Sequence, residues 1–111
     1  MKTVTGIDLV NIPDFISSIQ SGGEIFLRKI FTVDELKNPA PAHLAGIFAA
    51  KEAIIKALSI KPGLWHCITI VHQSDGRPIA KIKAPHQLSS SDLSISHSRD
   101  YAAALFVGIV H

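Results

Sequence analysis

The stretch from residue 42 to about residue 59 constrains the fold more than any other part of the chain. Ala, Leu and Ile dominate it, and these residues favour a helix. Between residues 44 and 58, every residue is apolar or glycine except Lys51, Glu52 and Lys56. A helix that is apolar around nearly its whole circumference needs neighbours on most sides. We therefore expect a long central helix that other elements enclose.

The three charges in this segment allow two interpretations. Glu52 and Lys56 are four residues apart, so they share one face of the helix, about 40° from each other. On an ordinary surface helix they would form a solvated ion pair that stabilises the helix by a few tenths of a kcal/mol. Because the other residues of the helix favour burial, the charged stripe of Lys51, Glu52 and Lys56 is instead expected to line a narrow cleft. There a carboxylate suits Mg²⁺ and an ammonium suits phosphate oxygens. Asp8, near the end of a strand, is the candidate second carboxylate.

The remaining segments predict short helices and antiparallel strands. Residues 3–10 alternate and are β-branched, which predicts a strand, and Gly6 within it marks a close backbone approach or a bulge. Thr32 followed by Glu35 is a capping-box pattern that opens a helical turn. The other expected elements are helices at 12–20 and 24–30 and strands at 65–72, 77–84, 93–98 and 101–110, with a hairpin through 74–76. The predicted fold class is α+β, an antiparallel sheet with a long central helix.

Length and composition predict one domain over residues 1–111. The formal net charge is +2 and the basic residues are dispersed, so nucleic acid is not an expected partner. Cys67 is the single cysteine, so no intrachain disulfide can form, and a cytoplasmic location is the default expectation. The N-terminus has no secretion-signal pattern, and the apolar run at 101–110 is shorter than the roughly 20 residues of a membrane-spanning helix. No membrane partner is expected either.

Several polar segments carry little information by themselves. An Asp that ends a strand, as Asp8 does, is most often a turn or cap residue. The Ser-His-Ser sequence at 96–98 is either an ordinary hairpin end or a place where a histidine donates to a phosphate. The Gly-Arg-Pro sequence at 76–78, taken alone, predicts a tight turn with an exposed edge. The other histidines show no metal-ligand spacing and receive no role; they lie at positions 43, 66, 72, 86 and 111.

Three segments together resemble a known family. They are "GIDLVNI" near the N-terminus, "FAAKEAIIKAL" in the long helix and "SISHSRDYAAALFV" near the C-terminus, with "GRP" between the last two. Their order and spacing are similar to those of the holo-acyl-carrier-protein synthase family of 4′-phosphopantetheinyl transferases. The resemblance implies the fold of that family and an Mg²⁺-dependent enzyme. Such an enzyme moves the phosphopantetheine arm of coenzyme A to a serine of an apo acyl carrier protein and releases adenosine 3′,5′-bisphosphate.

The resemblance also implies roles for the residues that match family motifs. Asp8 and Glu52 correspond to the metal-binding carboxylates. Glu52 is in addition the candidate base for the serine proton, directly or through a metal-bound water. Lys56 corresponds to the lysine that contacts the diphosphate, and with Glu52 it makes up the implied catalytic pair. The other implied coenzyme A-binding residues are Lys51, Gly76, Arg77, Pro78, Ser96 and His97.

Short members of this family assemble as homotrimers with sites between subunits, which fits the high apolar fraction of this chain. The sequence departs from the family where partners bind. Asp14 stands where an arginine usually helps to dock the carrier protein, and Ile47 stands where an arginine commonly precedes "FAAKEA". Ser59 and Ile60 replace a turn that usually contains glycine. Two other functions therefore stay open: a non-catalytic coenzyme A-binding or scaffolding homologue, and a small α+β binding module with surface ion pairs.

Overall fold

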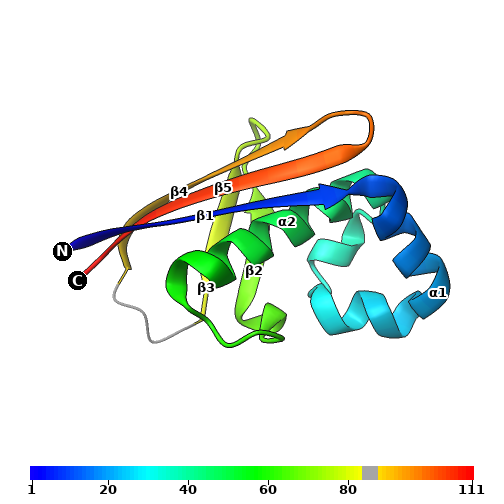
Figure 1. Cartoon of the computed structure of the whole chain (residues 1–111), viewed down its shortest axis with the longest axis horizontal. Helices are drawn as coiled ribbons and strands as arrows, with labels where there is room; N and C mark the ends of the chain where they lie inside the picture. The colour runs from blue at the N-terminus through cyan, green and yellow to red at the C-terminus, as the bar shows by residue number, and fades with distance from the viewer. Residues whose placement is uncertain (84–87) are drawn as a thin grey trace.

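The computed structural model describes residues 1–83 and 88–111. The described residues form two α-helices and five strands, and the predicted α+β class is confirmed (Figure 1). Within this part of the chain, no helix is long and apolar enough to cross a membrane. The elements are β1 (Lys2–Asn11), α1 (Ile12–Ile30), the 3₁₀ turn η1 (Glu35–Lys37), α2 (Pro41–Leu58), the 3₁₀ turn η2 (Trp65–Cys67), β2 (Ile68–His72), β3 (Pro78–Ile82), β4 (Leu88–His97) and β5 (Tyr101–Val110).

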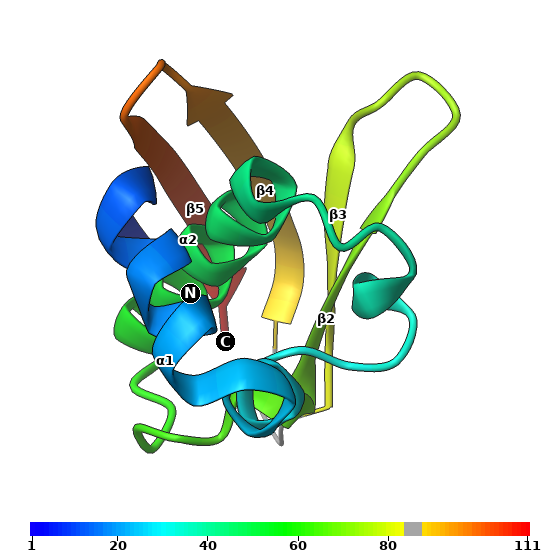
Figure 2. The same ribbon diagram turned by 90° about the vertical axis from the view of Figure 1, so that its right-hand side faces the viewer.

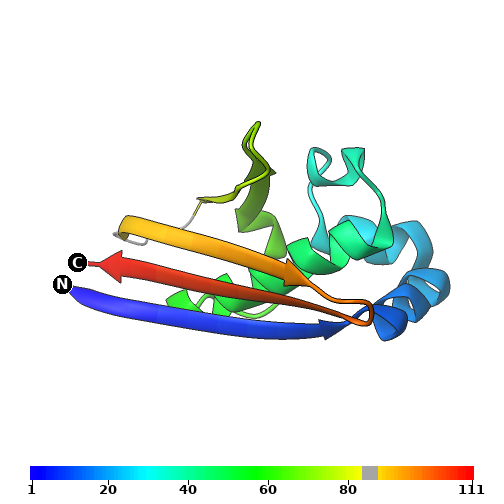
Figure 3. The same cartoon turned by 90° about the horizontal axis from the view of Figure 1, so that it is seen from above.

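The main sheet joins the two ends of the chain. Its strand order is β1-β5-β4 and all of its pairs are antiparallel, so β5 lies in the middle (Figure 3). Lys2 pairs with Val110, which brings the two termini side by side. The β2–β3 hairpin forms a separate two-stranded sheet. Because the N- and C-terminal strands pair over their full lengths, residues from both ends of the sequence share one surface.

α2 occupies the centre of the molecule, as its all-round apolar sequence predicts. It lies between the main sheet, α1 and the β2–β3 hairpin (Figure 2). Ile47 and Ile54, for example, are at most 1% exposed. Gly6 lets β1 approach the helix closely, since a Cβ at that position would lie only 1.8 Å from the carbonyl oxygen of Ala53. The predicted close backbone approach at Gly6 is confirmed.

α1 consists of two helical halves that meet at a kink. Gly23 has φ +58° and ψ −145°, a non-helical conformation that glycine adopts without strain. The sequence predicts separate helices at 12–20 and 24–30, and the two halves of α1 correspond to them. The Asn11 side chain caps the first half by accepting a hydrogen bond from the backbone N–H of Asp14 at 2.9 Å. The break between the two helices therefore lies at a glycine, as the sequence predicts.

The hairpins form where the sequence predicts them, but their bounds differ. β2 begins at Ile68 because the three residues before it form η2. β3 covers only part of the predicted strand at 77–84, whose last residue lies outside the described residues. β4 begins at Leu88, five positions earlier than predicted, and its register shifts between Leu88 and Ser90. The three serines at 89–91 do not alternate with apolar residues, so the sequence gives no strand signal there. Backbone pairing with β5 nevertheless extends the strand through them.

The outer face of the main sheet carries exposed apolar side chains. Successive strand residues point to opposite faces, so those facing away from α2 alternate with the buried ones. On β1, Ile7 and Leu9 are 66% and 64% exposed. Leu105, the register partner of Ile7, is 45% exposed. No described element covers these side chains.

Candidate active site

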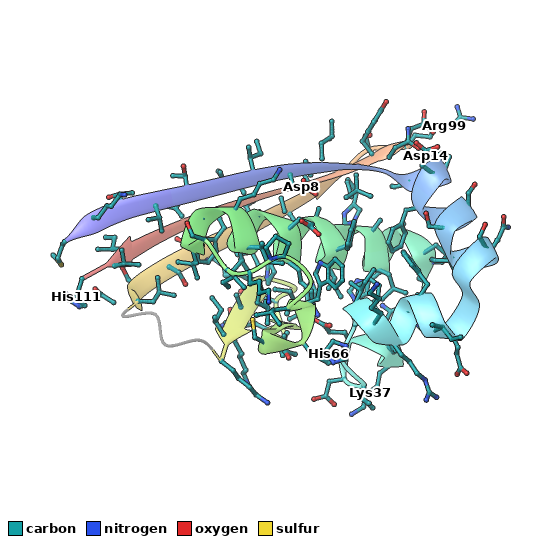
Figure 4. All side chains as sticks on the ribbon, turned by 60° about the horizontal axis from the view of Figure 1, so that its bottom comes forward. Asp8, Asp14, Lys37, His66, Arg99 and His111 are labelled. Atoms are coloured by element: carbon teal, nitrogen blue, oxygen red, sulfur yellow. The ribbon has the colours of Figure 1, made fainter. Side chains whose placement is uncertain are left out.

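Asp8 and Lys56 form an ion pair across the interface of β1 and α2. Lys56 Nζ lies 3.0 Å from Asp8 Oδ1 and donates a second hydrogen bond to the carbonyl oxygen of Ile7 at 3.1 Å. Asp8 stands on the helix-facing side of β1, where its side chain is largely shielded, while the Lys56 side chain is half exposed. Figure 4 shows Asp8 where β1 passes over α2. The structure therefore joins two of the predicted site residues that lie 48 positions apart in sequence.

Glu52 lies one helical turn before Lys56 on α2. Its Oε1 accepts a hydrogen bond of 2.9 Å from Trp65 Nε1. Trp65 belongs to η2, which follows the turn after α2, and sequence reasoning assigned it no role. Because this hydrogen bond orients the Glu52 carboxylate, the indole is a positioning residue for any chemistry that Glu52 performs.

Asp8 and Lys56 are in contact, and Glu52 lies one turn before Lys56 on the same face of α2; we call these two carboxylates and one ammonium the acidic cluster. Among residues 1–83 and 88–111, no group of three or more His, Cys, Asp and Glu side chains is placed to hold a metal ion by itself. Two carboxylates nevertheless fit Mg²⁺, which commonly takes one or two of them and completes its octahedron with waters and substrate phosphates. The donor set is therefore suited to a metal shared with a phosphorylated substrate.

Lys51 does not face this cluster, and the prediction that all three charges of α2 line one cleft is wrong for it. Its side chain is fully buried, and Nζ lies 2.6 Å from Glu35 Oε1. Nζ also donates to the carbonyl oxygens of Ile30 at 2.8 Å and Trp65 at 3.3 Å. Burial lowers the pKa of Lys51, and the hydrogen bond and charge of Glu35 partly offset that effect. Lys51 is a structural residue with no free donor facing a ligand.

Glu35 makes the capping contact that the sequence predicts and two further contacts that it does not. The predicted capping box is present, since the Thr32 N–H donates to Glu35 Oε1 at 2.8 Å and the Glu35 N–H donates to Thr32 Oγ1 at 3.3 Å. The other carboxylate oxygen accepts from the backbone N–H of Ile70 at 2.8 Å. Glu35 therefore ties η1 to β2, and through Lys51 it ties both to α2. Nothing in the local pattern pointed to these long-range contacts.

The Gly-Arg-Pro segment at 76–78 completes the turn of the β2–β3 hairpin, as predicted, and its Pro78 begins β3. Gly76 has φ +88°, which a glycine adopts freely, and the Arg77 N–H donates to Asp75 Oδ1 at 3.0 Å. This turn lines a groove of about 620 Å³ together with residues of β4 and β5. Gly76 and Pro78 also line a smaller pocket of about 200 Å³ that contains His97. The structure thus brings the predicted turn and His97 together.

Ser96 and His97 point to opposite faces of the sheet. The register partner of His97 is Ala102, a buried residue on the helix-facing side of β5. His97 Nε2 accordingly reaches the carbonyl oxygen of Ala42 at the start of α2, at 3.0 Å. Ser96 pairs with Ala103 and lies on the outer face. Two consecutive strand residues cannot serve a ligand on one face of the same chain.

Apart from Lys51 and Ser96, the predicted site residues therefore fall into two groups on different sides of α2. His43 lines the pocket of His97, and Glu52 follows it by nine positions. At about 100° per residue, this separation places Glu52 on the opposite side of the helix. A single chain consequently does not bring the acidic cluster and the His97 pocket into one site.

Comparison with known proteins identifies the family. The sequence profile of the 4′-phosphopantetheinyl transferase superfamily matches residues 5–106. The chain belongs to this superfamily. The resemblance found in the motifs is therefore confirmed.

Relatives within this superfamily align over nearly the full chain. The holo-[acyl-carrier-protein] synthase of Chlorobaculum tepidum is 43% identical over 108 residues, covering 90% of this chain and 92% of the relative. The synthase of Thermodesulfovibrio yellowstonii is 39% identical over 109 residues, with 92% and 94% covered. The chain and these proteins therefore match over at least 90% of their lengths.

Solved structures of phosphopantetheinyl transferases share the fold. The ACPS-CoA complex of Chronobacterium ammoniagenes superposes with a TM-score of 0.83 at 30% identity, covering 100% of this chain and 99% of the other. The holo-[acyl-carrier-protein] synthase of Neisseria meningitidis gives a TM-score of 0.85 at 28% identity, with 96% and 97% covered. The predicted family fold is confirmed.

Proposed function

We propose that this phosphopantetheinyl transferase moves the 4′-phosphopantetheine group of coenzyme A to a serine of an apo acyl carrier protein, with Mg²⁺, and releases adenosine 3′,5′-bisphosphate. The observation that carries the proposal is the acidic cluster, in which Lys56 contacts Asp8 and lies one turn from Glu52. The matching relatives are named holo-[acyl-carrier-protein] synthases, and one superposed structure is a complex with coenzyme A. The chemistry and the partners are inferred together from these two sources.

We assign the reaction as follows. Asp8 and Glu52 would hold Mg²⁺, and the ion would supply positive charge to balance that of the coenzyme A diphosphate. Lys56 donates to a diphosphate oxygen from the rim of the cluster, where its side chain is half exposed. Glu52 is oriented by Trp65 and accepts the proton of the carrier serine. The serine hydroxyl oxygen attacks the phosphorus of the phosphopantetheine group. The bond to the nucleotide phosphate breaks, and adenosine 3′,5′-bisphosphate leaves with the electron pair.

The nucleotide end of coenzyme A is proposed to bind at the groove and pocket around the hairpin turn and His97, with Gly76, Arg77 and Pro78 lining them. Because this region lies on the far side of α2 from the acidic cluster, one substrate can touch both only if two chains combine. We therefore propose a homotrimer with sites between subunits. The exposed apolar face of the main sheet supports such an assembly. Ser96 lies on that face and would reach a ligand only at an interface.

Residues 1–111 are proposed to act as one transferase domain, which the pairing of β1 with β5 supports. The cytoplasmic location expected from sequence stays a prediction.

The carrier-modification assay tests the proposed reaction. Incubation of the protein with coenzyme A, Mg²⁺ and an apo acyl carrier protein should add one phosphopantetheinyl group to the carrier, seen by mass spectrometry. Glu52→Ala should abolish the product while the protein stays folded. If several unrelated carriers remain unmodified although coenzyme A binds, the transferase proposal fails.

That outcome would favour the second candidate, a coenzyme A-binding homologue that no longer docks a carrier. Two departures from the family motivate it. Asp14 replaces a docking arginine and sits exposed in the first turn of α1, where an acid suits the helix dipole. Ile47 is 1% exposed and belongs to the core. Local structure thus explains both Asp14 and Ile47 without reference to the carrier. Binding of the carrier protein therefore has to be measured directly.

A further inference from the structure

Three histidines line the small pocket of about 200 Å³ beside the first turns of α2. His43 comes from α2, His72 from the end of β2 and His97 from the end of β4. The ring centroids of His43 and His72 are 5.0 Å apart. No residue of the described chain that lines this pocket carries a carboxylate. Three imidazoles without an acid form a surface that becomes positive when protons bind.

The pocket is shaped to hold these rings. A Cβ at Gly46 would lie 2.7 Å from His97 Nε2 and 3.0 Å from Ile95 Cγ2, so only glycine lets the His97 ring pack this close to α2. His97 Nε2 meets the carbonyl oxygen of Ala42 at 3.0 Å. Because a carbonyl only accepts hydrogen bonds, Nε2 carries the hydrogen. In this tautomer Nδ1 is an acceptor, and an imidazolium ring would donate from both nitrogens.

His43 resists protonation while the pocket is empty. Burial lowers the pKa of His43, and the neighbouring His72 and His97 lower it further, while Glu35 raises it slightly in return. The charged groups that line the adjoining groove are Asp75 and Arg77 of the hairpin and Asp92 of β4. An anion among the rings would reverse the balance, because it favours the protonated imidazoles. Anion binding and proton uptake are thus expected to be linked.

We propose that His43 and His72, together with His97, form a binding site for a phosphate group of coenzyme A. This proposal rests on the proposed function and extends it with two residues that the family resemblance did not assign. Gly76 and Pro78 of the hairpin turn line the same pocket, which connects it to the proposed nucleotide groove. A transition-metal site is the other chemistry that three histidines suggest, but no such group among the described residues is arranged to hold a metal. An anion is the occupant that the geometry favours.

The test compares wild-type protein with the double variant His43→Gln, His72→Gln by calorimetry. The probes are coenzyme A and dephospho-coenzyme A, at pH about 6 and pH about 8, on either side of an ordinary histidine pKa. The variant should bind coenzyme A about tenfold more weakly at the lower pH, as expected for losing a hydrogen bond to a charged group, and nearly normally at the higher pH. A phosphate monoester also takes up a proton near pH 6, so variant and wild type are compared at the same pH.

The matched control is His111→Gln. His111 bonds Ser89 and follows Val110, at the opposite end of β5 from Ala102, the register partner of His97 (Figure 4). This variant should bind coenzyme A as the wild type does at both pH values. His72→Gln alone, at an exposed position, provides a second variant if the double variant melts early. It should show a smaller loss of the same kind.

The outcomes separate the possibilities. A loss with coenzyme A but not with dephospho-coenzyme A supports a site for the 3′-phosphate, and a loss with both supports a site for the diphosphate. Equal affinity of wild type and variant at both pH values overturns the histidine site while leaving the proposed function standing. If wild-type protein binds no coenzyme A at either pH, the proposed function falls with it. Stoichiometric Zn²⁺ binding that the double variant abolishes, with coenzyme A affinity unchanged, would also overturn the anion site.

Discussion

Lys51 and Glu35 form an ion pair of 2.6 Å with both side chains fully buried, between the centre of α2 and the turn η1. The pair lies away from the acidic cluster, although Lys51 directly precedes Glu52 in the sequence. Carbonyl oxygens of Ile30 and Trp65 complete the surroundings of the ammonium. The contact ties together segments from four parts of the chain, and its role is structural.

Lys51→Met should therefore destabilise the protein strongly. Removing one partner of a buried pair leaves the other charge uncompensated, which costs about 3–5 kcal/mol. Urea denaturation would measure this as a loss in the free energy of unfolding. Lys56→Met is the matched control, because its pair with Asp8 is partly exposed and should contribute at most about 1 kcal/mol. Equal losses in the two variants would contradict the structural role of Lys51.

Asp8→Asn should weaken Mg²⁺ use without unfolding the protein. Mutation of a residue that hydrogen-bonds to a metal ligand lowers metal affinity roughly 10- to 100-fold, and loss of the ligand itself should lower it at least as much. The Mg²⁺ concentration for half-maximal carrier modification should rise accordingly. Asp34→Asn is the control, since Asp34 also pairs with a lysine, at 3.2 Å, on the surface. A large drop in melting temperature for Asp8→Asn alone would show that Asp8 is mainly a structural partner of Lys56.

Trp65→Phe should lower the rate of transfer more than the affinity for coenzyme A. The variant keeps a ring beside Phe48 but loses the hydrogen bond from Nε1 to Glu52. A hydrogen bond to a charged group contributes about 1.5–3 kcal/mol, so kcat should fall by about tenfold or more. Steady-state kinetics would show this as a lower kcat with KM for coenzyme A nearly unchanged. If KM for coenzyme A instead rises about tenfold while kcat stays unchanged, Trp65 does not position Glu52 for the reaction.

Ile7→Glu should disrupt self-association. Ile7 is 66% exposed on the outer face of the main sheet, so a charge there would be buried without a partner in an assembly that covers this face. Sedimentation equilibrium should report a trimer for the wild type and smaller species for the variant. Ile25→Glu is the matched control, because Ile25 is 84% exposed on α1 and should leave the assembly intact. A monomeric wild type would contradict the shared-site proposal.

His43 should make stability fall at mildly acidic pH. Its pKa lies below the ordinary 6.5 because of burial and the neighbouring His72 and His97. The unfolded chain therefore binds more protons than the folded one as pH falls through 6.5, and folded-state stability is lost in that range and regained above it. Urea denaturation at pH about 5 and about 7.5 should give a larger difference for wild type than for His43→Gln. The same pH dependence in both proteins would show that this group does not control stability there.

Local patterns predicted the elements and the family correctly. Alternation marked the strand with Asp8, the capping box marked Glu35, and Gly23 marked the break in α1, because each of these signals depends on residues close in sequence. The family motifs were also readable, since they are short and their order is distinctive. Bounds were less accurate where pairing of backbones extends a strand through polar residues, as at the start of β4.

What only the tertiary structure decided is which neighbours each charged side chain meets. The sequence by itself determined that α2 is enclosed and that three charges lie in its middle. Successive helical residues point about 100° apart, so the packing around α2 sends Lys51 into the core and leaves Glu52 and Lys56 on another side. The His43, His72 and His97 pocket likewise assembles from three elements that only the fold brings together. Burial is set by long-range packing, and no local spacing encodes it.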